Sequence, residues 1–506
     1  MKIKQTKMKQ VKLNRWTVVL AAAGLVSVAS VANADNSTPA STNHDGFFTR
    51  FDKALRADMS TPCYEPPATN APAPQRRGLP TPFDSPPYPT GEWQIGGTPI
   101  VGDPNAIPTW PLMEALDGTP SFGAALQKSK INFYGWEDFS GNISTSHNTA
   151  PGPNANFPEV YDLRPNRFEQ NQFVFYAERD PDEFQTDHID WGFRYSFVYG
   201  LDYRYMISRG FISEQLLKSG NYYGVDMPMM YGDLYIPFVA QGLNIRVGRI
   251  ISEADIEAQL APNNLMSSHS LLYGFDPYCQ WGVFGTLKLN KNWVVQAGVC
   301  LGNDVAPWQS DPGRQPTATA MAQWQSSDGK WGFYGGGNSI NNANFGYNNI
   351  QQYVGTWTYK FNDRIWTSQE TWYMYMKNAS DLPTLAVPFQ NGFFPTFANS
   401  DPNRANDGVT HFGYAPEWAT LNYTMFRLGP GTFFTVRNEY FDDFVGSRTG
   451  VATCYTEHSI GLTYWPNKLI TFRPELRYDR SVNKLAFDNG TRKQQFTVSF
   501  DVVFHY

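Results

Sequence analysis

From about Lys130 to its last residue, the chain alternates apolar and polar residues and shows little helical periodicity. In the stretch 188–201 the odd positions, which begin with Ile189, are apolar, while nearly all even positions are polar or small. Successive residues of a strand face opposite sides of a sheet, so this stretch predicts a strand with one apolar face. The stretches 470–479 and 496–506 repeat the pattern. We therefore predict an all-β region that begins near residue 130.

The length of these strands and their aromatic residues indicate that the apolar faces contact lipid. A soluble β-sandwich also alternates, so alternation alone does not decide between the two. The predicted strands approach the ~9–11 residues that cross a bilayer at a tilt. Their apolar faces are rich in Tyr and Trp, which suit membrane interfaces. The aromatic last residue, Tyr506, resembles the C-terminal recognition signal of bacterial outer-membrane barrels. We therefore favour a membrane barrel over a secreted soluble all-β protein.

The connectors between the predicted strands alternate in length, as expected when short turns are periplasmic and long loops are external. Counted back from the C-terminus, the long connectors 480–491 and 442–452 alternate with the short connectors 465–469 and 429–431. The series continues to the connector 141–167 and predicts about 16 strands, an even number that places both chain ends in the periplasm. The predicted fold is all-β: a transmembrane antiparallel β-barrel of about 16 strands with a Pro-rich periplasmic N-terminal extension.

Two details of strand orientation depend on single residues. In 365–376, tryptophans and methionines share a face with Glu370, and the cost of a carboxylate in lipid directs that face to the lumen. A three-residue turn at 290–292 places Cys279 and Cys300 on opposite faces, so we predict no disulfide between them.

The N-terminal part differs in composition from the predicted barrel. Residues 1–34 combine a basic start, an apolar stretch and a small-x-small pattern that ends at Ala34, as is typical of a secretory signal. A short amphipathic helix is predicted from Phe47, before a proline-rich stretch over 60–120 that predicts extended, irregular backbone. The predicted organisation is a signal peptide over 1–34, a Pro-rich periplasmic extension over 35–129 and a transmembrane β-barrel over 130–506.

Charge and hydropathy exclude two classes of protein. The chain has 40 Lys+Arg and 46 Asp+Glu, and loss of the six basic residues in 1–34 leaves 34 against 46, a net charge of -12. This balance argues against a nucleic-acid binder. After residue 34 no apolar run approaches the ~20 residues of a membrane helix. The expected partners are outer-membrane lipid and, through the C-terminal strand, the barrel-assembly machinery. The sequence leaves open whether the chain forms a homo-oligomer.

Several longer blocks carry a family resemblance. They are NFPEVYDLRPNRFEQNQ (156–172), DHIDWGFRYSFVYGLDYRY (187–205), GRIISEADIEAQLAPNN (248–264), SHSLLYGFDPY (268–278), GNDVAPW (302–308), GYNNIQQYVGTW (346–357) and ETWYMY (370–375). Together they resemble a family of outer-membrane β-barrel porins called OmpL-like, over most of 130–380. The resemblance implies an exported outer-membrane barrel with a pore, and it names no substrate.

A barrel of about 16 strands leaves a water-filled lumen, so the polar strand faces supply candidate pore-lining charges. The basic candidates are Arg194, Arg246, Lys360, Arg437, Arg473 and Arg477, and the acidic ones are Asp190, Glu370, Glu439, Glu475, Asp479 and Asp501. Rings of charge select ions in pores. Alternatively, these side chains only solvate the inner wall and pair with one another.

The connector 252–279 is the third external loop, and it looks similar to the third loop that general porins fold into the lumen. A serine suited to helix capping, the acids Glu253, Asp255 and Glu257, and then Pro262 predict a short helix at its start. Inside the lumen, these carboxylates opposite wall arginines would set a transverse field. Alternatively, they cap and solvate a helix on the surface.

Other chemistry is sparse. A hydrolase interpretation could start from Ser268-His269-Ser270, but no third catalytic group can be placed near these residues. A divalent ion could be bound by Asp255, Glu257 and His269. The sequence has no Walker loop, zinc-spaced Cys/His set or nucleophile elbow, so we predict no enzyme activity, cofactor or metal. The leading hypothesis is an outer-membrane channel for passive diffusion of small hydrophilic solutes or ions. The alternative is a structural or adhesive barrel that binds the cell wall or an external partner.

Overall fold

The computed structural model describes residues 45–61, 110–150, 153–183, 185–208, 210–251, 255–308, 316–341, 350–362, 364–380, 411–429 and 431–506. The predicted signal peptide, Glu253 and most of the proline-rich stretch lie outside these residues. All elements below belong to one compact unit, Phe47–Tyr506.

The strands form one antiparallel sheet of 17 segments. They are β1 (Asn132–Ser144), β2 (Phe168–Arg179), β3 (Asp190–Gly200), β4 (Gly224–Asp226), β5 (Met230–Ile236), β6 (Leu243–Ile251), β7 (Cys279–Lys288), β8 (Trp293–Asn303), β9 (Thr317–Gln325), β10 (Trp331–Ile340), β11 (Ile350–Asn362), β12 (Ile365–Ser380), β13 (His411–Gly429), β14 (Thr432–Asp443), β15 (Thr453–Tyr464), β16 (Ile470–Ser481) and β17 (Gln494–His505). β4 and β5 pair with the two ends of β3, so they are parts of one interrupted strand. The sheet therefore crosses 17 − 1 = 16 times, which confirms the predicted strand number.

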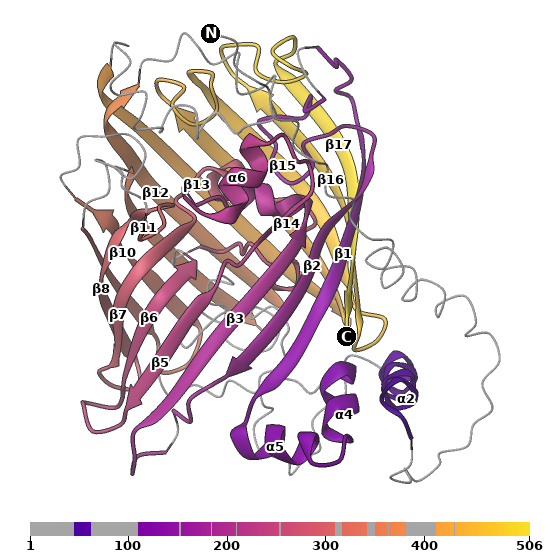
Figure 1. Cartoon of the computed structure of the whole chain (residues 1–506). Coiled ribbons are helices and arrows are strands. Elements are labelled where there is room, and N and C mark those ends of the chain that lie inside the picture. The colour runs from indigo at the N-terminus through magenta and orange to yellow at the C-terminus, as the bar shows by residue number, and fades with distance from the viewer. Residues whose placement is uncertain are drawn as a thin grey trace, which may run out of the picture. The chain divides into compact units, whose positions relative to one another are not determined.

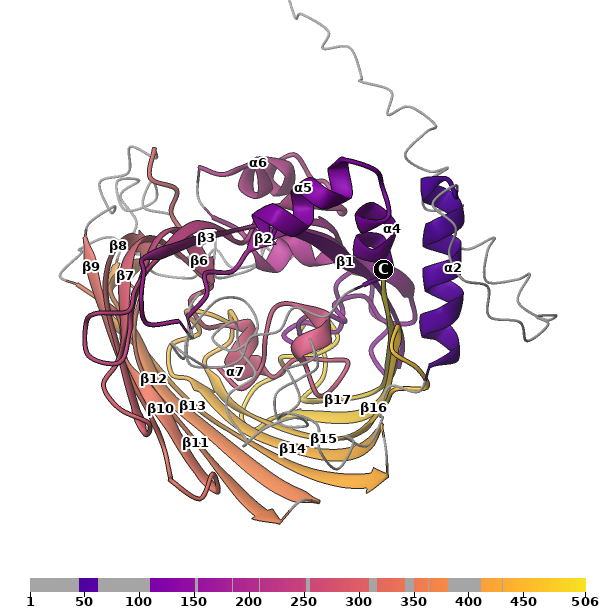
Figure 2. The same cartoon turned by 90° about the horizontal axis from the view of Figure 1, so that it is seen from below.

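Pairing of β1 with β17 closes the sheet into a barrel (Figures 1 and 2). The C-terminal residue strengthens this seam. The backbone N–H of Tyr506 donates to the carbonyl of Gly135 at 3.0 Å, and its hydroxyl donates to the carbonyl of Val174 at 2.7 Å. Its ring stacks on Phe173, with the ring centroids 5.8 Å apart. The aromatic terminus thus bridges β17, β1 and β2.

The helical segments are short. They are α2 (Phe47–Ser60), α4 (Pro111–Asp117), α5 (Phe122–Ser129), α6 (Ile212–Lys218) and α7 (Leu271–Gly274), with 3-10 turns η2 (Leu201–Tyr205) and η3 (Ala261–Asn263). α2 confirms the helix predicted from Phe47. The prediction of extended backbone throughout 60–120 is wrong at α4, which is helical. Pro111 is compatible with this helix because it lies in the first turn, where an N–H group would have no partner within the helix. No described helix is long and apolar enough to cross a membrane.

The strand faces follow the predicted alternation. In β3, Trp191 and Tyr195 are exposed, whereas Asp190 and Arg194 are buried toward the lumen. β16 and β17 alternate in the same way, with polar side chains inward and apolar side chains outward. In β12 the face that holds Glu370 is buried, as the cost of a carboxylate in lipid predicted. The barrel is therefore apolar outside and polar inside.

Cys279 and Cys300 are both buried and have free thiols, as the sequence predicted for residues on opposite faces. The register sets Cys300 opposite Gly282, which leaves Cys279 on the other face of β7. Their contacts differ accordingly: Cys279 contacts Ser208 and Arg249, whereas Cys300 contacts Thr317.

The first prediction tests the outward face of β3. Phe193→Arg should lower the free energy of unfolding by about 2–4 kcal/mol, the scale for arginine at the bilayer midplane. Phe193→Leu is the matched control and should cost less, because leucine keeps an apolar contact with lipid. Urea unfolding in lipid vesicles measures both variants. Equal stability of the two would contradict the lipid-facing assignment of Phe193.

Candidate functional site

The third external connector, between β6 and β7, lies inside the barrel. Nearly all residues of 255–278 are buried, and the view from below shows α7 within the ring of strands (Figure 2). We call residues 255–275 the inner segment. Its helix α7 packs against β13 and β14. The inner segment belongs to the same apolar cluster as the inward side chains of these strands.

The backbone of the inner segment is irregular, so the helix predicted between Glu253 and Pro262 is wrong for its described part. The N–H of Ile256 donates to Glu370 at 2.7 Å, and the N–H of Ala258 donates to the side chain of Asn264 at 2.8 Å. Side chains thus occupy donors that a helix would use for its own bonds. Pro262 lies within η3 and does not end a helix.

An apolar core inside the lumen attaches the inner segment to the wall. Its members from the segment are Ile256, Leu265, Met266, Leu271, Leu272, Tyr273 and Phe275. Its members from β12, β13 and β14 include Trp366, Trp372, Met374, Met376, Leu421, Tyr423, Met425 and Phe441. This core explains why tryptophans and methionines of β12 share the inward face with Glu370.

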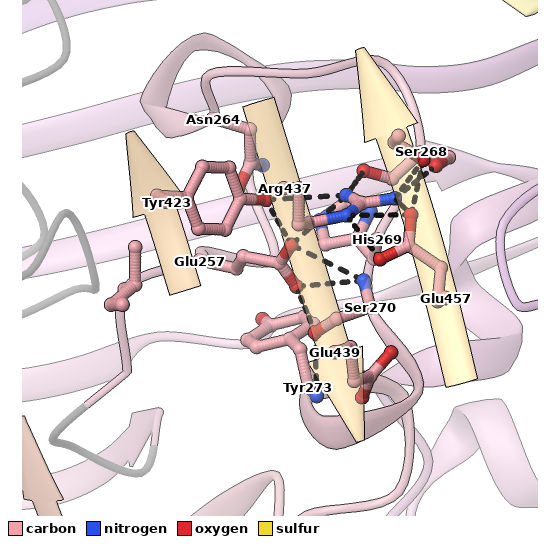
Figure 3. A network of polar contacts seen from close by, with 12 residues as sticks. Glu257, Asn264, Ser268, His269, Ser270, Tyr273, Tyr423, Arg437, Glu439 and Glu457 are labelled. Atoms are coloured by element: carbon pink, nitrogen blue, oxygen red, sulfur yellow. Dashed lines mark hydrogen bonds and ion pairs between the residues drawn. The ribbon is translucent and has the colours of Figure 1, made fainter. Parts of the chain in front are cut away.

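Arg437 of β14 is the centre of a buried polar network (Figure 3). Its guanidinium lies 3.2 Å from Glu257 of the inner segment, 3.1 Å from Glu457 of β15 and 3.0 Å from Glu475 of β16. It also donates to the carbonyl of Ser268 at 2.7 Å. All four charged side chains are at most 3% exposed. One arginine therefore joins the inner segment to three strands.

Two further wall arginines hold backbone carbonyls of the inner segment. Arg473 donates to the carbonyls of Ala261 and Asn264, each at 2.6 Å, and pairs with Asp501 on β17. Arg477 donates to the carbonyl of His269 and pairs with Asp479. Irregular backbone is tolerated at membrane depth only where protein satisfies it, and these arginines do so.

Carboxylates of the wall bind the N–H groups of the same segment. Glu439 accepts from Leu271 at 2.8 Å and also from Leu272. Glu475 accepts from the N–H of Ser268 at 2.8 Å. Wall arginines therefore bind carbonyl groups of the inner segment, and wall carboxylates bind its N–H groups.

The other predicted lining residues lie elsewhere on the wall. Arg194 pairs with Glu178, Arg246 pairs with Asp233 at 2.8 Å, and Asp190 pairs with Arg179 at 2.8 Å. The first two pairs match the interpretation in which wall charges pair with one another. Lys360 lies near the short turn that ends β11, with its ammonium 6.0 Å from the ring of Trp366. The structure thus gathers Asp255, Glu257, Glu370, Arg437, Glu439, Arg473 and Arg477 at the inner segment, and it separates Asp190, Arg194, Arg246 and Lys360 from that group.

Burial changes the ionisation of the inner segment. It lowers the pKa of His269 to about 3, so this imidazole is neutral at physiological pH. Burial, and then the negative charge of Asp276, raises the pKa of Asp255 well above its usual range. Of the three acids expected to set a transverse field, only Glu257 is seen facing an arginine: Asp255 faces other carboxyl groups, and Glu253 is not described.

The arrangement offers little for hydrolysis or metal binding. The Nε2 atom of His269 lies 2.9 Å from the carbonyl of Ala258, and the hydroxyl of Ser268 donates to Glu475 at 2.7 Å. Serine and histidine therefore bond to different groups and not to each other. Within the described ranges, no group of three or more His, Cys, Asp and Glu is arranged to hold a metal.

Sequence reasoning missed several participants. Glu457 was not among the predicted charges, although alternation along β15 places it on the inward face. Tyr423, whose hydroxyl contacts Glu257, gave no signal because tyrosine is common on both faces. The stretch 154–163 also lies buried beside the segment, where Tyr161 donates to Gln259 at 2.5 Å. Its many apolar residues, unusual for an external loop, could have indicated burial.

The chain matches a protein-family model and several solved structures. A family model described as putative beta-barrel porin-2, OmpL-like, matches residues 130–506. No curated protein matches the chain. Solved structures that match the chain include the outer membrane channel DcaP of Acinetobacter baumannii, at 10% identity over 74% of this chain and 97% of that one, with a TM-score of 0.45. The anion-selective porin from Comamonas acidovorans is 8% identical over 74% of this chain and 99% of that one, with a TM-score of 0.44.

The second prediction tests the network. Arg437→Met leaves three buried carboxylates without their cation. It should lower the free energy of unfolding by about 3–5 kcal/mol, the scale for breaking a buried ion pair. The inner segment should then become accessible to protease. Urea unfolding and limited proteolysis in detergent measure the two effects. Adding Glu257→Gln removes one of the uncompensated charges and should recover part of the loss. An Arg437→Met variant as stable and protected as the wild type would contradict the proposed anchoring role.

Proposed function

The chain belongs to the putative beta-barrel porin-2, OmpL-like family and is a porin-like channel of the outer membrane; we propose that it passes small hydrophilic solutes or ions by passive diffusion. The observation that carries this proposal is a closed barrel whose polar and charged side chains face inward. The inner segment would narrow the passage, and the residues that anchor it would form the constriction.

The lining of β7 to β11 supports passage of neutral hydrophilic solutes. Its inward side chains are mainly uncharged amides and hydroxyls, among them Gln280, Thr286, Gln296, Thr319, Gln323, Gln352, Thr356 and Thr358. Such groups can exchange hydrogen bonds with a passing solute without the cost of desolvating a charge. This side of the lumen is therefore the proposed path for uncharged polar molecules.

Ion selectivity is proposed to come from the balance of paired wall charges. Arg246 contacts Asp233 and Arg194 contacts Glu178, so each positive charge has a negative neighbour. The field of a pair falls off faster than that of a single charge, because the two contributions oppose each other. We therefore expect weak selectivity in the wild type, which loss of one partner should strengthen.

The remaining parts are assigned roles in export and assembly. Residues 1–34 would direct export, and residues 35–129 would lie in the periplasm before the barrel over 130–506. In support, Trp110 stacks on His505 near the C-terminus, with the ring centroids 4.4 Å apart. The C-terminal strand with Tyr506 would be recognised by the barrel-assembly machinery, and the apolar outer face would contact outer-membrane lipid.

A structural or adhesive barrel is the second candidate. The dense packing of the inner segment favours it, because Arg437 and Arg477 are fully buried and Arg473 nearly so. A barrel closed by its own loop would bind a wall polymer or an external partner without conducting.

The third prediction separates the two candidates. Replacement of 256–273 by a short Gly/Ser linker should raise single-channel conductance in planar bilayers, because the proposed constriction is removed. Circular dichroism should show that the β-barrel of the variant is retained. Absence of conductance from both the wild type and this variant would contradict the channel proposal and favour the structural barrel.

The fourth prediction concerns selectivity. Arg246→Gln leaves Asp233 uncompensated and should shift the reversal potential in a salt gradient toward cation preference. Arg246→Gln combined with Asp233→Asn is the matched control: it removes the pair without changing the net charge and should stay near the wild type. An identical shift in both variants would show that the shift does not arise from the uncompensated Asp233.

A further inference from the structure

The connector between β16 and β17 is basic, although the chain as a whole has more acids than basic residues. Residues 480–493 contain one acid, Asp488, and four basic residues, which are Arg480, Lys484, Arg492 and Lys493. By contrast, the other long external connectors predicted from the sequence have at least as many acids as basic residues. The basic connector lies at the end of the barrel away from the C-terminus (Figure 1).

The outward side chains of β16 and β17 form rows of different character. From the external loops toward the membrane centre, the paired residues are Arg480 with Gln494, Tyr478 with Phe496, and Leu476 with Val498. Outer-membrane barrels carry aromatic girdles where their apolar band meets the polar interface. The row of Tyr478 and Phe496 therefore marks that boundary, and Arg480 lies just outside it, at the depth of the lipid headgroups.

A pocket of 510 Å³ lies at this boundary, and we call it the rim pocket. Its volume is within the range of about 300–1,000 Å³ that is usual for ligand sites. One part of its lining is apolar or aromatic and the other is polar or basic: Tyr478, Leu485 and Phe496, and Arg492, Lys493 and Gln494. Leu485 and Phe496 are exposed, so the apolar part of the rim pocket is continuous with the lipid-facing surface of the barrel.

Arg492 is oriented by neighbours on two sides of the rim pocket. It donates from Nη1 to the carbonyl of Thr145 at 2.9 Å, and its Nε lies 3.3 Å from a carboxylate oxygen of Asp488. Asp488 is buried and also accepts from the backbone N–H groups of His147 at 2.7 Å and Asn148 at 2.6 Å. The guanidinium is thus held in place by the protein, while 41% of the Arg492 side chain remains exposed.

Two further cations accompany Arg492 at the same depth. Arg480 lies opposite Thr456 on β15 and Gln494 on β17, so neither of these strand neighbours carries a negative charge. Lys493 directly precedes β17 and is exposed at the rim pocket. Basic side chains at a membrane surface attract anionic lipid headgroups. Lipid is therefore well placed to supply the counter-charge for these three cations.

We propose that the rim pocket binds the phosphorylated headgroup of a lipid in the outer leaflet of the outer membrane. Arg480, Arg492 and Lys493 contact the phosphate, because guanidinium and ammonium groups form charge-assisted hydrogen bonds with phosphate oxygens. Leu485 and Phe496 contact the adjoining acyl chains. A soluble anion satisfies only the basic part of the rim pocket, whereas a lipid satisfies the basic and the apolar parts together.

The inference rests on the proposed contact between the outer wall and outer-membrane lipid, and it adds the chemistry of the headgroup. Equal stability of Phe193→Arg and Phe193→Leu would count against lipid contact itself, whereas the tests below address only the headgroup. Conduction does not enter the inference, so a failed conductance test would leave it standing.

The first test measures binding of diphosphorylated lipid A to the purified protein in detergent by native mass spectrometry. Arg480→Gln with Lys493→Gln should stay folded, because both side chains are exposed. Each basic residue near an anionic lipid surface contributes a factor of about five, so this double variant should bind about 25-fold more weakly than the wild type. Equal binding by the wild type and the double variant would overturn the proposal.

Lys291→Gln with Lys330→Gln is the matched control for the first test. Both lysines are exposed and lie at short turns, at the opposite end of the barrel, and their loss changes the net charge by the same amount. The control should bind lipid A as the wild type does. Equal weakening in the control would show that net charge, and not the rim pocket, determines binding, and would also overturn the proposal.

The second test separates a lipid headgroup from a free phosphate. Dephosphorylated lipid A should bind the wild type much more weakly than lipid A, and Leu485→Asn should weaken binding of lipid A without changing any charge. Inorganic pyrophosphate at equal concentration should not displace lipid A, because it makes no contact with Leu485 and Phe496. Displacement by pyrophosphate, or unchanged binding by Leu485→Asn, would assign the rim pocket to a soluble anion and overturn the lipid assignment. Equal binding of the two forms of lipid A would overturn the role of phosphate.

Discussion

Closure of the sheet through the pairing of β1 with β17 is the constraint on which the rest of the structure depends. In hydrocarbon no water satisfies exposed backbone groups, so a membrane sheet without closure would leave two unpaired edges. Tyr506 contributes bonds to this seam through its backbone and its hydroxyl. Once the sheet is closed, every strand has one face toward the lumen and one toward the membrane, and each residue's environment follows from its position in the alternation.

The lumen gathers charges that the membrane would exclude. Buried ion pairs are expensive unless their geometry and remaining hydrogen bonds are good. Arg437 meets this condition with three carboxylates and a carbonyl, and Arg473 meets it with Asp501 and two carbonyls. The irregular inner segment and the charged wall are therefore interdependent. Each supplies the hydrogen-bonding groups that the other would otherwise leave buried and unpaired.

β12 and β13 connect the lumen to the outer surface. Their inward faces carry Trp372 and Leu421 for the core that attaches the inner segment, and their outward faces carry Gln369 and Asn422. The orientation of each strand fixes both faces at once, because adjacent residues of a strand point to opposite sides of the sheet. The part of the wall that anchors the inner segment thus also carries polar side chains on its outer face, and these bond to one another: Gln369 donates to Thr420, and Asn422 donates to Thr367 at 3.1 Å.

The sequence by itself determined the strand number, the connector pattern and most strand faces, because alternation and turn composition are local properties. It also placed Arg437, Arg473 and Arg477 on the inward side. It failed where capping signals before Pro262 predicted a helix. Only the tertiary structure decided which residues meet in the lumen. Glu257 and Arg437 are 180 positions apart in the chain, and local patterns carry no information about a contact between such distant residues.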